Sequence, residues 1–336
     1  MKKTVFLPCH PNMWEGFQTI WEQEISDPEN IVTVIPIPTY QIGPNGTLYD
    51  AEYITTGYPD NVEICDINDY DLEAEHPDTI YIQNIADNNN PVFAVHPHFH
   101  TVNLRSFTDN LVYIPYSTLN ETDPESIYLR NVYSKIITPP GINNIDRMIV
   151  SSESIKTMYL NLLSGGDLEL LKKWYSRITC DNYPRVKILK KYTKDTVPYP
   201  QAWNRHLFDV DGNRKESVLF TTSAFGVLQF NRSHFRTAQK IFEEYESKKG
   251  NTCFIWRPNK FLPDIIMKYR PELFEDFRLL LEFYITHDIG IFDEAPTPTP
   301  AIILADSYIG DDCMVKDLFA TTGKPIYSYS DSSDIL

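Results

Sequence analysis

Short runs of apolar, β-branched residues alternate along this chain with stretches of helical periodicity. In the first half, strands are expected at 4–7, 31–37, 79–83, 111–115 and 147–151. Helices are expected between and after them, near 12–25, 69–75, 98–107, 125–135 and 152–163. Runs of this length and composition are typical of buried strands. Their alternation with helices predicts an α/β fold, in which helices cover both faces of a parallel sheet.

A second series of the same kind begins near residue 217. Strands are expected at 217–223, 252–257, 290–293, 301–310 and 324–329, and helices at 231–248, within 271–286 and around 313–321. The helix at 231–248 is expected to turn one apolar face to a core, and that face carries Phe235, Ala238, Ile241, Phe242 and Tyr245.

Two segments interrupt this alternation. Residues 38–61 are rich in Gly, Pro, Asn and Tyr and predict an irregular excursion with a hairpin around "PNG". Residues 180–215 mix prolines, charges and aromatic residues, which indicates a crossover between domains. A chain of 336 residues fits two domains better than one. The expected domains are 1–190 and 191–336.

Charge and cysteine content exclude several classes of function. Thirty basic and 46 acidic residues give a net charge of −16, which disfavours binding to nucleic acid or to anionic lipid surfaces. The five cysteines are widely spaced and lack a C-x-x-C pair, so neither a disulfide framework nor a zinc site is expected. No apolar run is long enough for a membrane span or a signal peptide. A cytoplasmic protein without metal or cofactor is the expectation.

Polar residues follow several strands of the second series, where ligands bind to parallel sheets. Thr222 and Ser223 offer hydroxyl and N–H donors that suit phosphate oxygens. Arg257 carries a planar set of donors, and a salt bridge to a neighbouring carboxylate is the alternative for it. Asp311 either orients a hydroxyl-bearing ligand or caps a helix. The helix start at Cys313 favours a lowered thiol pKa, but no histidine is nearby in sequence, which disfavours a nucleophilic role.

The first series has candidate residues in two places. His10 and Asn12 precede a helix that contains Trp14, and either they bind an anion there or Asn12 simply caps the helix. The "HPHFH" segment places three imidazoles at alternating positions, a spacing that suits metal ligands in a strand. Pro97 disfavours a strand, and no matching carboxylate cluster is evident. One imidazole, that of His96, is therefore expected to reach a cleft.

Several motifs in collinear order resemble the CDP-glycerol glycerophosphotransferase family, which builds teichoic-acid-like polymers. They are "SVLFTTSAFGVLQ", "FIWRPNKFL", "YRPELFEDF", "ILADSYIGDDCMV" and "ATTGKPIYSY". In the front half, "MWEGFQTIWE", "VIPIPTY", "VHPHFHTVNLRSFTDNLVYIPY" and "IDRMIVSSESIKTMYLNLL" are similar to a shorter branch of that family. The resemblance implies a GT-B-like fold of two Rossmann-like domains with parallel sheets facing across a cleft.

The resemblance also implies roles for residues and shows where this chain departs from the family. Arg257, Ser223 and Asp311 match the family, whereas Asn259 stands at its W-R-P-H-P-L histidine. Cys313 and Met314 replace a pair of serines. A tryptophan-histidine-glycine-threonine-proline motif, which carries a catalytic histidine in the polymerases, is replaced by "YIPY". The expected proton-transfer residues are therefore His10 and His96.

The expected activity is transfer of glycerol or ribitol phosphate from a CDP-linked donor to a hydroxyl of a cell-surface polysaccharide or teichoic-acid-like acceptor. Thr222, Ser223, Arg257, Asn259, Asp311 and Cys313 are expected on the donor side, and Asn12 and Trp14 on the acceptor side. Domain 191–336 would hold the nucleotide and domain 1–190 the acceptor. Membrane contact, if any, is expected through a partner. The alternatives are a GT-B glycosyltransferase that uses another nucleotide sugar and a catalytically inactive GT-B-like binding module.

Overall fold

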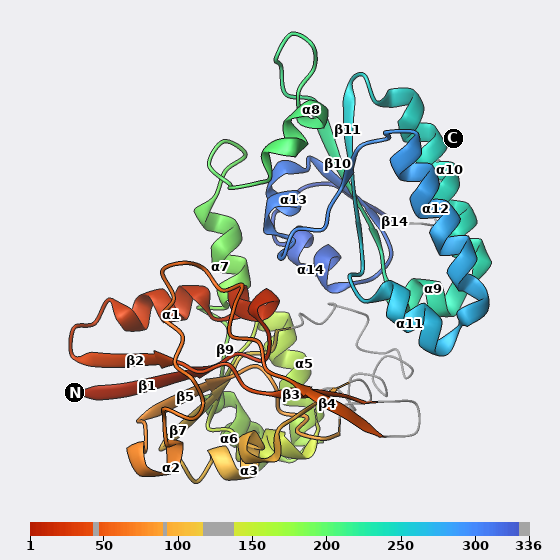
Figure 1. Ribbon diagram of the computed structural model, residues 1–336. Helices are drawn as coiled ribbons and strands as arrows, with labels where there is room; N and C mark the ends of the chain where they lie inside the picture. The colour runs from red at the N-terminus through yellow and green to blue at the C-terminus, as the bar shows by residue number, and fades with distance from the viewer. Residues whose placement is uncertain (43–46, 90–92, 117–137, 329–336) are drawn as a thin grey trace. The chain divides into compact units, whose positions relative to one another are not determined.

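The computed structural model describes residues 1–42, 47–89, 93–116 and 138–328 of the chain. The chain forms two compact units, Met1–Ile188 and Leu189–Leu336, and each contains a parallel sheet of its own. Figure 1 traces the elements from the red N-terminus to the blue C-terminal part. No helix among the described residues is both long and apolar enough to cross a membrane.

The first unit is built on a six-stranded parallel sheet with the order β2-β1-β5-β7-β8-β9. Its strands are β1 (Lys2–Leu7), β2 (Asn30–Val34), β5 (Thr79–Ile82), β7 (Asn110–Tyr113), β8 (Arg147–Ile149) and β9 (Ile178–Thr179). Strand β1 lies between β2 and β5, and Phe6 is in register with Val34 on one side and Tyr81 on the other. From β1 the chain adds β2 on one side and then β5 and the later strands on the other. The boundary between β1 and β5 is therefore a topological switch point.

Helices cover both faces of this sheet. They are η1 (Pro11–Gly16), α1 (Gln18–Ile25), α2 (Leu72–Glu75), η2 (Pro97–Phe99), α3 (Thr101–Leu104), η3 (Pro140–Asn144), α5 (Glu153–Ser164), α6 (Leu168–Arg177) and α7 (Pro184–Lys191). Successive strand residues point to opposite faces, so Val5 and Leu7 belong to one apolar cluster and Phe6 to another. The predicted parallel sheet, with helices on both faces, is confirmed.

Local sequence signals set the ends of these helices. Ser152 caps α5 by accepting a hydrogen bond from the Ile155 N–H, and Gly165 ends it with φ 56°. Asp167 then caps α6, which was not predicted. The expected helices at 69–75 and 98–107 are shorter than predicted, and the second divides into η2 and α3. The expected helix at 125–135 lies outside the described residues.

The excursion at 38–61 forms the predicted hairpin. Strands β3 (Thr39–Ile42) and β4 (Leu48–Glu52) pair antiparallel, with the turn itself outside the described residues. A third strand, β6 (Phe93–Val95), pairs antiparallel with β3 and completes a small separate sheet. This strand was not predicted, because three residues carry too little periodicity to be recognised in a sequence.

The second unit has a five-stranded parallel sheet with the order β12-β11-β10-β13-β14. Its strands are β10 (Glu216–Thr222), β11 (Thr252–Pro258), β12 (Ile291–Phe292), β13 (Ser307–Gly310) and β14 (Ile326–Ser328). Strand β10 lies between β11 and β13, with Thr221 in register with Arg257 on one side and Gly310 on the other. From β10 the chain adds β11 and β12 on one side and then β13 and β14 on the other. The boundary between β10 and β13 is therefore the switch point of the second sheet.

The helices of this unit lie on both faces of the sheet. They are η4 (Gln201–Trp203), α8 (Asn204–Leu207), α9 (Ala224–Phe230), α10 (Arg232–Lys248), α11 (Leu262–Tyr269), η5 (Pro271–Leu273), α12 (Phe274–Thr286), α13 (Thr299–Leu304) and α14 (Met314–Ala320). In Figure 1, α10 and α12 lie side by side on one face, and α13 and α14 on the other. The predicted core stripe of α10 is confirmed, with Tyr245 only partly buried.

The predicted strand at 301–310 is wrong over its first half. Residues Thr299–Leu304 form α13, all six of them buried, and only Ser307–Gly310 form a strand. A short helix buried on every side has no polar face, so its sequence resembles that of a buried strand. Pro300 fits here because the first turn of a helix does not need the missing N–H.

Candidate functional site

The loops that follow β10 and β13 meet at the carboxyl edge of the second sheet. Ser223 directly follows β10, and Asp311 directly follows β13. The backbone N–H of Ser223 lies 3.2 Å from each carboxylate oxygen of Asp311, and the Ser223 hydroxyl donates to Oδ2 at 2.5 Å. Two of the predicted donor-side residues are therefore in direct contact at the switch point.

Ser223 also starts a helix in this position. Its Oγ accepts a hydrogen bond from the Gly226 N–H at 2.9 Å and so caps α9. A Cβ at position 226 would lie 1.9 Å from Asp311 Oδ2 and 2.6 Å from His234 Cε1. Glycine is thus required by the close approach of two side chains, and any larger residue would displace them.

A buried histidine completes this group. His234, on α10, is 3% exposed, and its Nε2 lies 3.7 Å from Asp311 Oδ2. Burial raises the pKa of Asp311 to about 6 and lowers the pKa of His234 to about 4. Both shifts have the same cause, since a buried site disfavours the charged form of either group. His234 was missed in the sequence, because it directly precedes the expected core stripe of its helix and no local motif marks it.

Cys313 has a raised pKa, in contrast to the lowering that its position at a helix start suggested. Its Sγ lies 3.5 Å from the hydroxyls of Thr221 and Tyr308, which also hydrogen-bond to each other. Burial, and then the charge of Asp311, raises the pKa of Cys313. The expected lowering of this pKa is therefore wrong, because desolvation of the thiolate outweighs any favourable helix dipole.

Arg257 takes the salt-bridged alternative. One terminal nitrogen lies 2.8 Å from Asp293 Oδ2, and the other donates to the Ala295 carbonyl at 2.9 Å. The side chain of Asp293 is fully buried and that of Arg257 is 14% exposed. The guanidinium thus neutralises a buried carboxylate and holds the loop that follows β12.

The other two donor-side residues also bond within the fold. Thr222 is buried, and its hydroxyl accepts a hydrogen bond from the Trp256 indole N–H at 2.9 Å. Asn259 is exposed, and its Oδ1 accepts from the Phe261 N–H at 2.9 Å, just before α11. Its own N–H donates to the Thr222 carbonyl, which ties the loops after β10 and β11 together.

In the first unit, His10 rather than Asn12 caps the first helical turn. The Nδ1 of His10 accepts from the Asn12 N–H at 3.1 Å, and the Asn12 carbonyl accepts from the Tyr116 hydroxyl at 2.9 Å. Trp14 is 3% exposed and packs edge-to-face against Phe17. The structure therefore places the imidazole at the end of β1 and the indole in the core.

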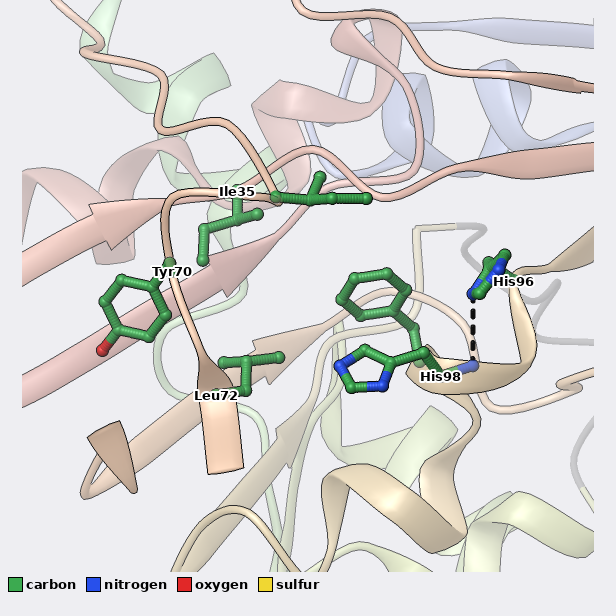
Figure 2. A pocket seen from close by; sticks show the side chains of 7 residues that line it. Ile35, Tyr70, Leu72, His96 and His98 are labelled. Atoms are coloured by element: carbon green, nitrogen blue, oxygen red, sulfur yellow. Dashed lines mark hydrogen bonds between the residues drawn. The ribbon is translucent and has the colours of Figure 1, made fainter. Parts of the chain in front are cut away.

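His96 borders a cavity of about 130 Å³ within this unit. Figure 2 shows the lining side chains, which are those of Ile35, Ile67, Tyr70, Leu72, His96, His98 and Phe99. The Nδ1 of His96 accepts from the His98 N–H at 3.3 Å. The histidine segment forms η2 instead of a strand, and no metal-ligand cluster occurs among the described residues.

Two further residues near the carboxyl edge of the first sheet were missed. Gln83 follows β5 and donates from Nε2 to the Met13 carbonyl at 2.8 Å. Arg185, from α7, is 1% exposed; it donates to the Tyr116 carbonyl at 3.0 Å and lies 4.4 Å from the centre of the Tyr116 ring. Only Gln83 had a signal in the sequence, as the polar last residue of the strand predicted at 79–83.

Comparison with known proteins establishes the fold. No protein-family model matches the sequence, and a search of curated proteins finds no match. Among solved structures, S. aureus MnaA with UDP has a TM-score of 0.55 at 11% identity, covering 97% of this chain and 79% of that one. A putative UDP-N-acetylglucosamine 2-epimerase from Listeria monocytogenes has 0.54 at 12%, covering 98% and 79%.

A third similar structure is the Methanocaldococcus jannaschii UDP-GlcNAc 2-epimerase in complex with UDP-GlcNAc and UDP. Its TM-score is 0.54 at 11% identity, and the match covers all of this chain and 87% of that one. Identities this low bear on the fold alone. The expected α/β, GT-B-like fold, with a parallel sheet in each of two units, is confirmed.

Proposed function

We propose that this protein is an enzyme that binds a nucleoside-diphosphate-linked donor, and specifically that it transfers glycerol or ribitol phosphate from a CDP-linked donor to a hydroxyl group. The acceptor would be a cell-surface polysaccharide or a teichoic-acid-like polymer. The collinear motifs of the sequence and the GT-B-like fold support this proposal. It includes a cytoplasmic location, with any membrane association through a partner.

The observation that carries the proposal is the Ser223–Asp311 contact at the switch point of the second sheet. Ligands of doubly wound sheets bind in the crevice outside the strand ends at this boundary. Hydroxyl and N–H donors from Ser223 suit the oxygens of a diphosphate. Arg257 contributes by holding the loop after β12, since both of its terminal nitrogens donate within the fold.

The proposed reaction needs a base and charge stabilisation. The acceptor oxygen forms a bond to the phosphorus of the donor's alditol phosphate, and the bond from that phosphorus to the bridging oxygen breaks, so CMP leaves. The hydroxyl proton passes to an imidazole, for which His10 and His96 are the proposed residues. Asn259 cannot take this proton near neutral pH, because an amide has no basic nitrogen.

A second candidate function is catalysis on another nucleotide sugar. The observation that favours it is the similarity in fold to S. aureus MnaA solved with UDP and to a UDP-GlcNAc 2-epimerase solved with UDP-GlcNAc and UDP. The donor side would be the same, and only the base and sugar contacts would differ. The choice of donor therefore separates the two candidates.

A thermal-shift panel with CDP-glycerol, CDP-ribitol, UDP-GlcNAc and a GDP-sugar tests the proposal. A saturating ligand at 100 times its Kd adds about 2.7 kcal/mol, which is readily detected as a rise in Tm. We expect the two CDP-alditols to stabilise the protein most. Stabilisation by UDP-GlcNAc alone would favour the second candidate. Stabilisation by a CDP-alditol without any release of CMP would favour the catalytically inactive module.

The proposed bases are tested by CMP release from CDP-glycerol. We expect His10→Ala or His96→Ala to slow release by about 10²–10⁴-fold, the usual contribution of general-base catalysis. His98→Ala is the matched control, since this neighbour of His96 packs its ring against Phe107. Unchanged release in both single variants would show that neither imidazole is the base.

A further inference from the structure

The hydrogen-bond donors of Ser223 are already occupied by a negatively charged group of the protein. Asp311 accepts from both the backbone N–H and the hydroxyl of Ser223. These are the donors that the proposed function assigns to a ligand phosphate. A carboxylate and a phosphate oxygen make the same kind of charge-assisted hydrogen bond, so the two compete for them.

The surroundings of Asp311 do not supply a strong counter-charge. Its carboxyl faces Ser223 after β10 and the imidazole of His234 on α10. On its own loop, Asp312 adds a further negative charge, which is paired with Lys316. Cys313 follows, and the Tyr308 hydroxyl from β13 donates to the Asp311 backbone carbonyl. Among the described residues no Lys or Arg forms an ion pair with Asp311.

Bringing a phosphate beside this carboxylate would place two negative charges in a largely buried site. Burying unpaired charge is costly, so one of the two must leave or be neutralised. Protonation of the pair formed by Asp311 and His234 achieves this without moving the backbone. The raised pKa of Asp311, about 6, brings such protonation within reach of neutral pH.

We infer that Asp311 acts as an internal anion that competes with the donor's phosphate for Ser223, and that phosphate binding is coupled to uptake of one proton by the Asp311–His234 pair. The proton comes from solvent and is released again when the ligand leaves. This inference rests on the proposed function, because it requires a phosphate-bearing donor at this edge. It makes Asp311 a regulator of binding instead of a phosphate contact.

Calorimetric titration of the full chain tests this coupling. CDP-glycerol and UDP-GlcNAc are suitable probes, because their phosphates are diesterified and do not titrate near neutral pH. Repeating each titration at pH 7.5 in buffers of different ionisation enthalpy gives the number of protons taken up. We expect a value near one. We also expect affinity to fall about tenfold per pH unit above pH 7, as linkage requires for one proton.

Two matched variants locate the proton. Asp311→Asn removes the competing charge, so we expect no proton uptake and a flat pH dependence, with at least tenfold tighter binding at pH 8. Asp312→Asn makes the same change in net charge one residue away, and we expect it to behave as the wild type. Should Asp311→Asn fail to fold, the wild-type proton count decides by itself.

The outcomes separate this inference from the proposed function. Binding to wild type without proton uptake, or equal behaviour of the two variants, would overturn the inference and leave the function standing. Binding to Asp311→Asn alone would support it, because the carboxylate would then be the obstacle. If neither probe binds either protein, both the inference and the proposed function fail.

Discussion

At the scale of single residues, the sequence indicated which polar side chains lie at strand ends but not what they bond to. Arg257 was expected to bind phosphate or a neighbouring carboxylate, and its partner Asp293 lies 36 residues further along the chain. His234 gave no signal at all, because its chemistry depends on Asp311 and Gly226, which come from other segments. Pairings of this kind follow from the packing of elements, which a local pattern does not contain.

The Arg257–Asp293 pair provides a stability prediction. Replacing Arg257 with Met leaves a fully buried carboxylate without its counter-charge, so we expect a loss of about 3–5 kcal/mol in the free energy of unfolding. Urea denaturation measures it. Arg278→Met is the control, because the ion pairs of Arg278 are on the surface and its loss should be barely measurable. Equal losses in the two variants would show that the buried pair is not stabilising.

Asp311 and His234 are expected to change the stability of the fold in opposite directions as the pH falls. Between pH 6.5 and about 4, the unfolded chain protonates His234 before the folded chain does, so this histidine lowers stability as the pH falls. Asp311 does the opposite between about 6 and 3.8, because the folded chain takes up its proton first. The two effects largely cancel in the wild type.

Removing Asp311 should expose the histidine's effect. Relative to wild type, we expect Asp311→Asn to lose stability by up to about 1.4 kcal/mol per pH unit from pH 6 to 4. Measurement of Tm against pH tests this, with Asp312→Asn as the reference for a simple loss of charge. Parallel curves for wild type and Asp311→Asn would mean that the two groups do not offset each other.

At the scale of elements, strands with strong β-branched patterns were predicted well, and short buried helices were not. The sequence of 301–310 predicts one strand because α13 is apolar on every side. Its identity as a helix is fixed partly by a distant side chain. Lys324 donates to the carbonyls of Ile302, Ile303 and Ala305 at the end of α13, and so satisfies groups that the helix leaves without partners.

Loss of this cap should weaken the second unit. We expect Lys324→Met to lower the free energy of unfolding by about 1–3 kcal/mol, because buried carbonyls lose their donor. Lys316→Met is the control, since its i,i+4 pair with Asp312 is worth only about 0.5 kcal/mol. Chemical denaturation followed by tryptophan fluorescence compares the two. A smaller loss for Lys324→Met than for the control would argue against its capping role.

At the scale of the whole molecule, β–α alternation was sufficient to predict a parallel sheet in each half. What it could not give is the balance of charge around a ligand. The chain carries a net charge of −16, and the cation expected at the donor side is neutralised by Asp293. The proposed donor, with its two phosphates, would therefore approach a protein of its own sign.

This charge balance predicts an inverse salt dependence. Salt screens repulsion over a Debye length of about 10 Å at 0.1 M, so raising NaCl from 20 to 150 mM should increase the association rate of CDP-glycerol. We expect a change of about two- to fivefold in stopped-flow fluorescence, with UDP-GlcNAc behaving alike. A rate that falls with added salt would indicate a positive site that attracts the donor.

The absence of a side chain at position 226 links two distant parts of the chain. The missing methyl group leaves the room in which the carboxyl after β13 reaches the turn after β10. A related chain with alanine at this position would have to move or lose its acid at position 311. Glycine and aspartate should therefore appear or disappear together among relatives, and their joint presence would identify the chains whose ligand binding responds to acidity.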